Sequence, residues 1–290
     1  MQQLLPTSAR QKLAIARNFS KAASTYDQAA IIQQEVGQRL LERLELIKLS
    51  PTTILDLGSG TGFFSQALSK KYPDAIVLNT DISEGMINFA KQVRHSPKQF
   101  HLCADGDYLP IKSHSIDFFF SNCALSWFFL PRTVFKEIRR LLKPEGLLLF
   151  STFGPDTLQE LKACFNMLDD KEHINPFIDM HDIGDMLLQE GLLGPVMDME
   201  HITLAYKDIQ TLINDLKLTG ARFVNNLPSN SRGLFTPRYF QKLLSLYARH
   251  FQDADQKFSA TFEVIYGHAW AGQSPIPESR KIAFTLEDEI

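Results

Sequence analysis

The sequence lacks the cysteine pattern of a metal-binding or disulfide-rich protein. Its 290 residues include three cysteines, Cys103, Cys123 and Cys164, and no two of them have the short spacing of a metal site. Their neighbours are largely apolar, so we expect reduced thiols within a core, as in a protein of the cytoplasm. The pattern therefore excludes a disulfide scaffold and predicts no cysteine-based metal site.

Long apolar runs and a strong net charge are also absent. No stretch of about 18 apolar residues occurs, so the sequence predicts no transmembrane helix. The first ten residues lack the apolar core of a secretion signal. The net charge of −3 gives the whole chain no nucleic-acid signature, and no internal repeat is evident. With 44% hydrophobic residues, the chain is long enough for one large domain, or for one domain with a smaller cap.

One short stretch has the pattern of a ligand-binding turn. Residues 54–62 begin as a buried strand and end in three alternating glycines, Gly58, Gly60 and Gly62. These glycines allow a tight turn and leave space for a ligand against bare backbone. The helix-forming segment that follows offers free N–H groups, which favour negative charge. The glycine spacing differs from that of a dinucleotide-binding turn, and no Lys-Ser or Lys-Thr follows as in a Walker loop.

Strands and helices alternate around this turn. Short apolar runs predict strands, and segments with a 3.6-residue apolar period predict helices. The expected order is strand 53–57, helix 63–71, strand 75–81, helix 84–93, strand 99–104, strand 116–121, helix 131–142 and strand 147–152. This alternation is typical of a doubly wound α/β fold with a mostly parallel sheet.

Helical segments precede and follow this alternation. Residues 10–49 have a helical pattern, and later helices are expected at 156–168, 180–190, 208–218 and 237–250, with strands at 196–205 and 261–266. The two late strands would complete the sheet as an antiparallel pair. We divide the chain into an N-terminal helical lid (1–49), a core (50–206 and 258–270), a helical cap over the active site (207–257) and a loosely ordered tail (271–290).

Polar side chains stand at the ends of four successive strands. Asp56 and Asp81 end the first two strands, and Asp105 and Asn122 follow the next two. Because open α/β sheets bind ligands outside the carboxyl ends of their strands, we expect these side chains to converge on one crevice. An acid at Asp81 can accept hydrogen bonds from both hydroxyls of a ribose, and one at Asp105 can accept from the amine of an adenine.

This arrangement resembles the class I S-adenosylmethionine-dependent methyltransferases. The family's Asp-x-Gly-x-Gly-x-Gly stretch and its later acids match residues 56–62, Asp81 and Asp105, and the resemblance covers about residues 50–152. It implies a Rossmann-like sheet of seven strands that binds S-adenosylmethionine, with Ile82 and Met86 along the adenine. Tyr26 either closes over the cofactor or packs in the core at the start of a helix. The implied cofactor-binding residues are Tyr26, Asp56, Gly58, Gly60, Gly62, Asp81, Ile82, Met86, Asp105, Gly106 and Asn122.

A narrower resemblance extends over most of the chain, from about residue 10 to residue 270. Residues 19–27, 121–127, 151–161 and 216–221 are similar to the malonyl-acyl-carrier-protein O-methyltransferases of biotin synthesis. This resemblance implies methylation of the free carboxylate of a malonyl thioester, carried by an acyl-carrier protein or by coenzyme A. A carboxylate is already ionised at neutral pH. We therefore expect alignment and removal of water, with no obligatory catalytic base.

The residues that would bind the acceptor are less clearly marked. Trp127 either lines the acceptor channel or packs in the core. A malonyl carboxylate calls for a cation, and arginine suits it best through bidentate contacts. Arg222 is our candidate, although a solvated surface arginine would have the same pattern. His173 and His181 are interpreted as surface or loop histidines without a direct role.

The predicted cap is basic. Residues 207–257 contain eight Lys or Arg and four Asp, a net charge of +4 in a chain of net −3. Acyl-carrier proteins are acidic, so Arg232, Arg238 and Lys242 are predicted to dock the carrier. An ordinary solvated surface is the alternative.

Three other functions fit parts of the pattern. One is another small-carboxylate methyltransferase with the same core. A second is a methyltransferase-like assembly factor of respiratory complex I that acts on a protein arginine. This chain is similar to that factor at residues 154–158 and in the cap. The third is a scaffold without activity.

Overall fold

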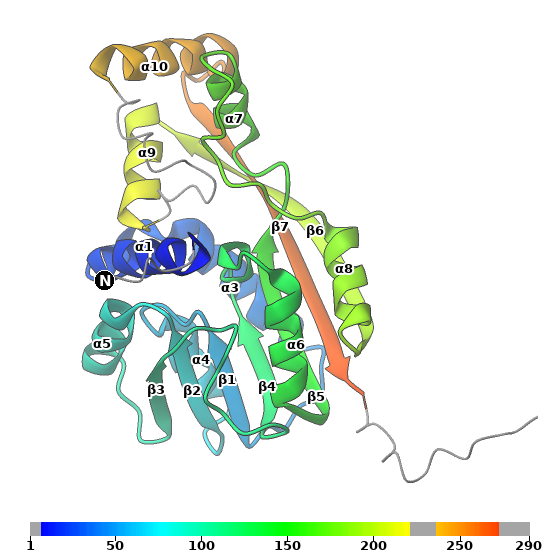
Figure 1. The fold of residues 1–290 in the computed structure, drawn as a ribbon. Coiled ribbons are helices and arrows are strands. Elements are labelled where there is room, and N and C mark those ends of the chain that lie inside the picture. Colours follow the sequence, from blue (N-terminus) through cyan, green and yellow to red (C-terminus); the bar gives the residue numbers. More distant parts are fainter. Residues whose placement is uncertain (1–6, 221–235, 273–290) are drawn as a thin grey trace, which may run out of the picture.

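The computed structural model describes residues 7–220 and 236–272, and its centre is a seven-stranded sheet of order β3-β2-β1-β4-β5-β7-β6 (Figure 1). The neighbouring strands from β3 to β5 are parallel, and β7 runs antiparallel to β5 and β6. The strands are β1 (Thr53–Leu57), β2 (Ile76–Asp81), β3 (Gln99–Cys103), β4 (Ile116–Ser121), β5 (Leu142–Phe153), β6 (Leu192–Tyr206) and β7 (Phe258–Ala271). The predicted mostly parallel α/β sheet with a late antiparallel pair is confirmed.

Helices cover both faces of this sheet. They are α1 (Thr7–Ala22), α2 (Tyr26–Ala29), α3 (Ile31–Leu44), α4 (Phe63–Lys71), α5 (Glu84–Val93), α6 (Pro131–Leu141), α7 (Gln159–Asn166), α8 (Met180–Gln189), α9 (Ile209–Leu218) and α10 (Pro237–Phe251). A 3₁₀ turn spans Leu125–Trp127. No helix of the described residues is long and apolar enough to cross a membrane.

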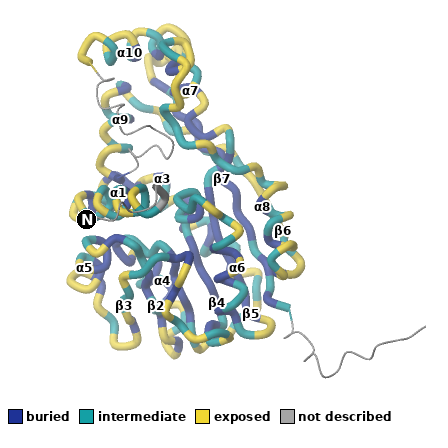
Figure 2. The backbone as a smooth tube through the Cα atoms, in the orientation of Figure 1, coloured by how far each residue is buried: buried dark blue, intermediate teal, exposed yellow. Residues whose placement is uncertain are grey.

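The β4 strand joins the two hydrophobic cores of the molecule. Its run of three phenylalanines is fully buried, with Phe118 and Phe120 in the core on the side of α3 and α4. Phe119 points to the opposite core, which contains residues of α6 and α8. A strand buried on both faces explains why its sequence is continuously apolar instead of alternating. Figure 2 shows the same burial along the central strands.

The last two strands are longer than the sequence predicted. β6 and β7 pair from Leu192–Ala271 to Tyr206–Phe258, well beyond the expected 196–205 and 261–266. β7 also lies against β5, so its backbone is bonded on both sides. Tertiary pairing therefore extends a strand whose last residues have no strong strand preference of their own.

Helix α7 starts later than the predicted residue 156 because the preceding turn is bonded to β7. The Thr157 hydroxyl donates to the carbonyl of Glu263 at 3.1 Å, and the Leu158 N–H donates to the carbonyl of Thr261 at 2.6 Å. Leu158 also takes a left-handed conformation with φ of 57°. These bonds hold residues 154–158 as a turn and delay the helix to Gln159.

The long β6–β7 ribbon extends to the helices at the top of the molecule (Figure 1). There α9 contacts α2, and α10 packs beside α7. Although α7 falls in the range that we assigned to the core, it lies with the cap helices. Residues 221–235 of the predicted cap and 273–290 of the predicted tail lie outside the described residues.

The three cysteines are free thiols, as expected, but one of them is not in a core. Cys123 and Cys164 are buried, and Cys103 is exposed. The expectation was wrong for Cys103 because β3 is the edge strand of the sheet, so its last residue faces solvent. Local sequence does not tell an edge strand from a central one.

We predict that Leu40→Ala lowers the free energy of unfolding by about 2–5 kcal/mol, because Leu40 of α3 is fully buried in the core and its truncation leaves a cavity. Gln38→Ala, on the exposed side of the same helix, should change it by no more than about 0.5 kcal/mol. Urea titration followed by circular dichroism would measure both. Equal losses in the two variants would contradict the assigned packing face of α3.

Candidate active site

The glycine turn is attached to the end of β2 by the Asp81 carboxylate and by two backbone bonds, in which the N–H groups of Gly58 and Ser59 donate to the carbonyl of Thr80 at 2.8 and 3.0 Å. Asp81 accepts a hydrogen bond from the Gly60 N–H at 2.9 Å and another from the Ser83 N–H at 2.7 Å. Gly58 and Gly60 both have positive φ, of 68° and 53°. A Cβ on Gly58 would lie 2.3 Å from the Cβ of Ala124, so only glycine fits there. The turn therefore depends on its glycines for shape and on Asp81 for position.

The two acids at this edge have different surroundings, because Asp56 is buried and Asp81 is only partly so. Burial raises the pKa of Asp81 to about 6, while the N–H groups of Gly60 and Ser83 oppose that rise. Burial raises the pKa of Asp56 to about 7, against the effect of the Ser65 hydroxyl that donates to it. At neutral pH the Asp81 carboxylate is therefore largely ionised and able to accept hydrogen bonds.

A cavity beside this turn, which we call the donor pocket, brings together nine of the eleven predicted cofactor residues. They are Tyr26, Gly58, Gly60, Asp81, Ile82, Met86, Asp105, Gly106 and Asn122. Asp56 and Gly62 do not line it. Asp56 is bonded to Ser65 behind the turn, and a Cβ on Gly62 would lie 3.2 Å from Ala90 and from Asn79. In this structure these two residues support the turn from behind.

Helix α1 closes the donor pocket, and no sequence pattern predicts the residues that hold it there. The Lys12 ammonium pairs with Asp105 at 2.6 Å and also with Asp107. Burial lowers the pKa of Lys12, but the bonds to these two carboxylates outweigh it and raise the pKa. At the other end of the helix, the Ser20 hydroxyl lies 2.9 Å from the Ser83 hydroxyl. A lone lysine 93 residues before its partner has no pattern by which it could be found.

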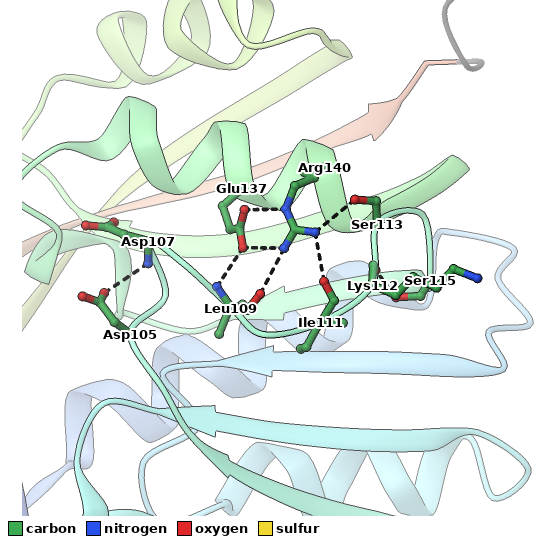
Figure 3. A network of polar contacts seen from close by, with 9 residues as sticks. All are labelled: Asp105, Asp107, Leu109, Ile111, Lys112, Ser113, Ser115, Glu137 and Arg140. Carbon is green, nitrogen blue, oxygen red and sulfur yellow. Dashed lines mark hydrogen bonds and ion pairs between the residues drawn. The ribbon is translucent and has the colours of Figure 1, made fainter.

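The loop between β3 and β4, which carries Asp105, is held by a polar network (Figure 3). The Arg140 guanidinium of α6 donates to the carbonyls of Ile111 and Leu109 at 2.9 and 3.0 Å. Glu137 accepts from the Leu109 N–H at 2.7 Å and pairs with Arg140. This network attaches the loop to α6. It therefore holds in place the loop that carries Asp105.

A second, larger cavity of about 420 Å³ lies under α9 and α10, and we call it the cap pocket. Its walls are mostly apolar and aromatic, from α2 and α3, α7, the segment after α7, β6, β7 and the two cap helices. The aromatic residues that line this pocket and not the donor pocket include Phe153, Phe165, Phe177, Tyr206, Phe240 and Phe262.

Four residues line both pockets and form the wall that the pockets share: Phe19, Tyr26, Cys123 and Trp127. The Phe19 ring contacts that of Trp127 edge to face, with centroids 5.1 Å apart, and lies 6.4 Å from that of Tyr26. Trp127 thus lines both cavities and also packs against a neighbour, and its role toward the acceptor stays a prediction. A ligand in one pocket would meet a ligand in the other at this wall.

His173 lies in the loop between α7 and α8, in keeping with its interpretation as a surface or loop histidine, but its side chain is not at the surface. Its side chain is 2% exposed, and its Nε2 lies 2.8 Å from a carboxylate oxygen of Asp169. The Tyr239 hydroxyl of α10 donates to the other oxygen of Asp169 at 2.8 Å, and the Phe165 ring stacks on the imidazole at 4.2 Å. The covering side chains come from α7 and α10, which are distant in sequence. His181, by contrast, is exposed at the start of α8.

The predicted carrier-docking residues are only partly described. Arg238 and Lys242 are exposed on α10, a helix that contains no Asp or Glu. Arg222 and Arg232 lie outside the described residues, so their predicted roles stay predictions.

Comparison with known proteins extends the similarity beyond the donor half. A family model described as "Methyltransferase domain" matches residues 55–150. A protein of Gallionella capsiferriformans named malonyl-[acyl-carrier protein] O-methyltransferase is 46% identical, over 89% of this chain and 90% of its own. A protein of the same name from Methylovorus sp. is 42% identical, over 91% of this chain and 90% of its own. Another, from Legionella pneumophila, is 37% identical, over 89% of this chain and 90% of its own.

Solved structures with low sequence identity share the fold. YcgJ of Bacillus subtilis superimposes with a TM-score of 0.59 at 14% identity, over 82% of this chain and all of its own. Phosphoethanolamine N-methyltransferase 2 of Haemonchus contortus, solved with S-adenosylhomocysteine, gives 0.52 at 16% identity, over 81% of this chain and 52% of its own. At such identities the likeness supports the sheet topology alone.

We predict that affinity for S-adenosylmethionine falls about tenfold per pH unit below pH 6, because the ionised form of Asp81 is the hydrogen-bond acceptor and its pKa is about 6. Above that pH the affinity should not depend on pH, and it should decrease as the pH falls through the pKa. Asp81→Asn should bind at least tenfold more weakly at neutral pH and show little of this dependence. Calorimetry from pH 5 to 8 would measure both proteins.

Asp117→Asn is the matched control. Asp117 sits at the opposite end of the sheet, where it accepts hydrogen bonds from Thr52 and Thr53, and burial opposed by these bonds and by Lys143 leaves its pKa below the usual range. Its amide variant should keep the affinity and the pH dependence of the wild type. An unchanged pH dependence in Asp81→Asn would show that another group titrates.

Proposed function

The chain belongs to the family of malonyl-[acyl-carrier protein] O-methyltransferases, and we propose that it transfers the methyl group of S-adenosylmethionine to the free carboxylate of malonyl-[acyl-carrier protein]. The product is a methyl ester, which fits the start of pimeloyl assembly in biotin synthesis. The observation that carries this proposal is the pair of pockets that share the wall of Phe19, Tyr26, Cys123 and Trp127.

The residues of the donor pocket fit S-adenosylmethionine. Asp81 offers a carboxylate for the ribose hydroxyls, and a Cβ on Gly60 would have no neighbour within 4 Å, so bare backbone is open to a ligand there. Asp105 lies further along the pocket for the adenine amine. When bound, the cofactor supplies a methyl group on a sulfonium, and the chain's own residues have only to orient it toward the shared wall.

The cap pocket suits a carboxylate that must lose its water. Methyl transfer from a sulfonium to a carboxylate neutralises both charges, so an apolar site that solvates the reactants poorly favours the reaction. Of the described residues that line the cap pocket, the charged ones are Lys217 and Asp215, which lie two positions apart on α9. The ionised acceptor needs no base, and the chain's contribution is alignment and exclusion of water.

The size of the cap pocket favours an acceptor with a long apolar arm. A malonyl group alone would fill only a small part of about 420 Å³. We propose that the rest holds the end of the pantetheine arm that carries the thioester. The aromatic residues around it would pack against that arm.

Helix α10 is our candidate for docking the carrier. Its inner side contributes Phe240 to the cap pocket, while its outer side exposes Arg238, Lys242 and Arg249 without an acidic residue between them. A basic helix at the edge of the acceptor pocket would attract an acidic carrier protein and place its arm close to the pocket. The cytoplasmic location expected from the free cysteines stays a prediction.

We predict that labelled S-adenosylmethionine and malonyl-carrier protein yield a base-labile labelled ester. Acetyl-carrier protein, which has no free carboxylate, is the control and should remain unlabelled. Trans-aconitate and a cell extract of proteins, tested in parallel, represent the small-carboxylate and protein-arginine alternatives. Cofactor binding by calorimetry without any transfer to the malonyl thioester would overturn the proposal.

We predict that Arg238→Glu with Lys242→Glu raises KM for malonyl-carrier protein about tenfold and leaves KM for malonyl-CoA within twofold, because only the carrier meets the outside of α10. Steady-state kinetics with both substrates would show it. Lys48→Glu with Lys70→Glu is the matched control, since both lysines are exposed on other helices or loops. Equal losses with the two substrates would mean that α10 does not recognise the carrier.

A further inference from the structure

Arg94, at the end of α5, joins the glycine turn to helix α2. Its guanidinium donates one hydrogen bond to the carbonyl of Thr61 in the turn and another to the carboxylate of Asp27 in α2, both at 2.6 Å. The Thr61 hydroxyl donates to the other oxygen of Asp27, also at 2.6 Å. Three side chains from three elements thus form one closed set of polar contacts, which we call the Arg94 network.

The Arg94 network is largely shielded from water. The Arg94 side chain is 10% exposed, that of Asp27 is 29% exposed, and Thr61 is buried. The guanidinium also lies over the Phe63 ring, 5.3 Å from its centroid. A shielded ion pair adds little net stability, because the loss of hydration offsets the attraction between the charges. The planar guanidinium, however, donates in fixed directions, so it can bond to both partners only when they are correctly placed.

Helix α2 depends on the Asp27 carboxylate for its position on the donor side. The helix is a single turn, Tyr26–Ala29, and Ala29 is the buried residue among its four. A break at Ala30 separates it from α3, so it does not extend that longer helix. Helix α9 contacts it from the side of the cap. On the other side, the Arg94 network attaches it to the glycine turn.

Tyr26, the neighbour of Asp27, belongs to the wall that the two pockets share. The side chains of Asp27, Thr61 and Arg94 line neither the donor pocket nor the cap pocket. They can therefore act on a ligand only through the residues that they hold in place. Because Tyr26 and Asp27 are adjacent in one helical turn, a shift of the carboxylate also moves the Tyr26 ring.

We propose that Arg94, Asp27 and Thr61 are positioning residues that set the shared wall against the glycine turn, so that the methyl donor and the acceptor meet in line. This inference rests on the proposed function. The turn that would bind S-adenosylmethionine thereby also fixes the place of Tyr26. Each ligand keeps its own binding contacts without the network, so its loss should impair alignment more than binding.

The first test follows the wall itself and needs no acceptor. The chain contains two tryptophans, Trp127 in the wall and Trp270 in β7. In a Trp270→Phe background with S-adenosylhomocysteine bound, quenching of fluorescence by acrylamide measures how well Trp127 is covered. We expect Asp27→Asn and Arg94→Met each to raise the quenching constant about twofold. Calorimetry should show an affinity for S-adenosylhomocysteine within about threefold of the wild type.

A mild variant and a matched control accompany these two. Thr61→Val keeps the size of the side chain and the backbone carbonyl but removes the hydroxyl donor, so it should raise the quenching constant by less. Asp117→Asn is the control, because Asp117 also pairs with a cation, Lys143, but at the opposite end of the sheet. It should change neither quenching nor affinity. Asp27→Asn combined with Arg94→Met should be no worse than Arg94→Met alone, since both act through one contact.

Steady-state kinetics test the consequence for methyl transfer. With malonyl-carrier protein as acceptor, Asp27→Asn should lower kcat about tenfold and leave KM for both substrates within about threefold. A role in stability alone would not produce this difference between kcat and KM. Arg94→Lys keeps the charge but lacks the planar fork that reaches both partners, so it should recover only part of kcat.

Two results would overturn the inference. One is an unchanged quenching constant and an unchanged kcat in Asp27→Asn and Thr61→Val. The other is a loss of S-adenosylhomocysteine affinity as large as the loss of kcat, which would make the Arg94 network a support of the donor pocket alone. Wild-type protein that transfers no methyl group, while the variants show the expected quenching, would instead contradict the proposed function and leave the positioning role standing.

Discussion

The donor half of the molecule depends on the carboxylate of Asp81. Two backbone N–H groups from different elements, Gly60 in the turn and Ser83 before α5, converge on its two oxygens. This side chain therefore links the glycine turn to the entrance of α5, beside the backbone bonds from Gly58 and Ser59 to Thr80 that join the ends of β1 and β2. Its burial beside Asp56 also makes both carboxyls weaker acids than usual. A group that organises the backbone and remains ionised near neutral pH can serve a ligand without any rearrangement of the turn.

Much of this half could be predicted because its signals are local. Strand 53–57 and helix 63–71 have their predicted bounds, and acids at strand ends must meet once the strands are parallel neighbours. The rest could not be predicted, since it depends on contacts across long stretches of chain. Lys12 reaches Asp105 over 93 residues, and His173 is buried by a helix that starts 64 residues later. No spacing pattern within the sequence predicts such pairs.

The two pockets have opposite chemical character, one polar and the other apolar. The donor pocket is built from backbone turns and acids, which suit a polar nucleoside. The cap pocket is built from aromatic and aliphatic side chains, which suit a reaction in which two charges disappear. The long β6–β7 ribbon makes this division possible, because it extends from the same sheet to the helices that cover the acceptor side (Figure 1).

The shared wall has a consequence for how such an enzyme can change. A substitution at Phe19, Tyr26, Cys123 or Trp127 alters the surroundings of both ligands at once, so its effects on the two should be coupled and not additive. Positions such as Phe165 or Ile213 line the cap pocket and not the donor pocket. During divergence within the family, new acceptor preferences would therefore arise at positions that line one pocket. The residues of the shared wall would tolerate few substitutions. The division into two pockets thus also determines which positions of the sequence are free to vary and which are constrained.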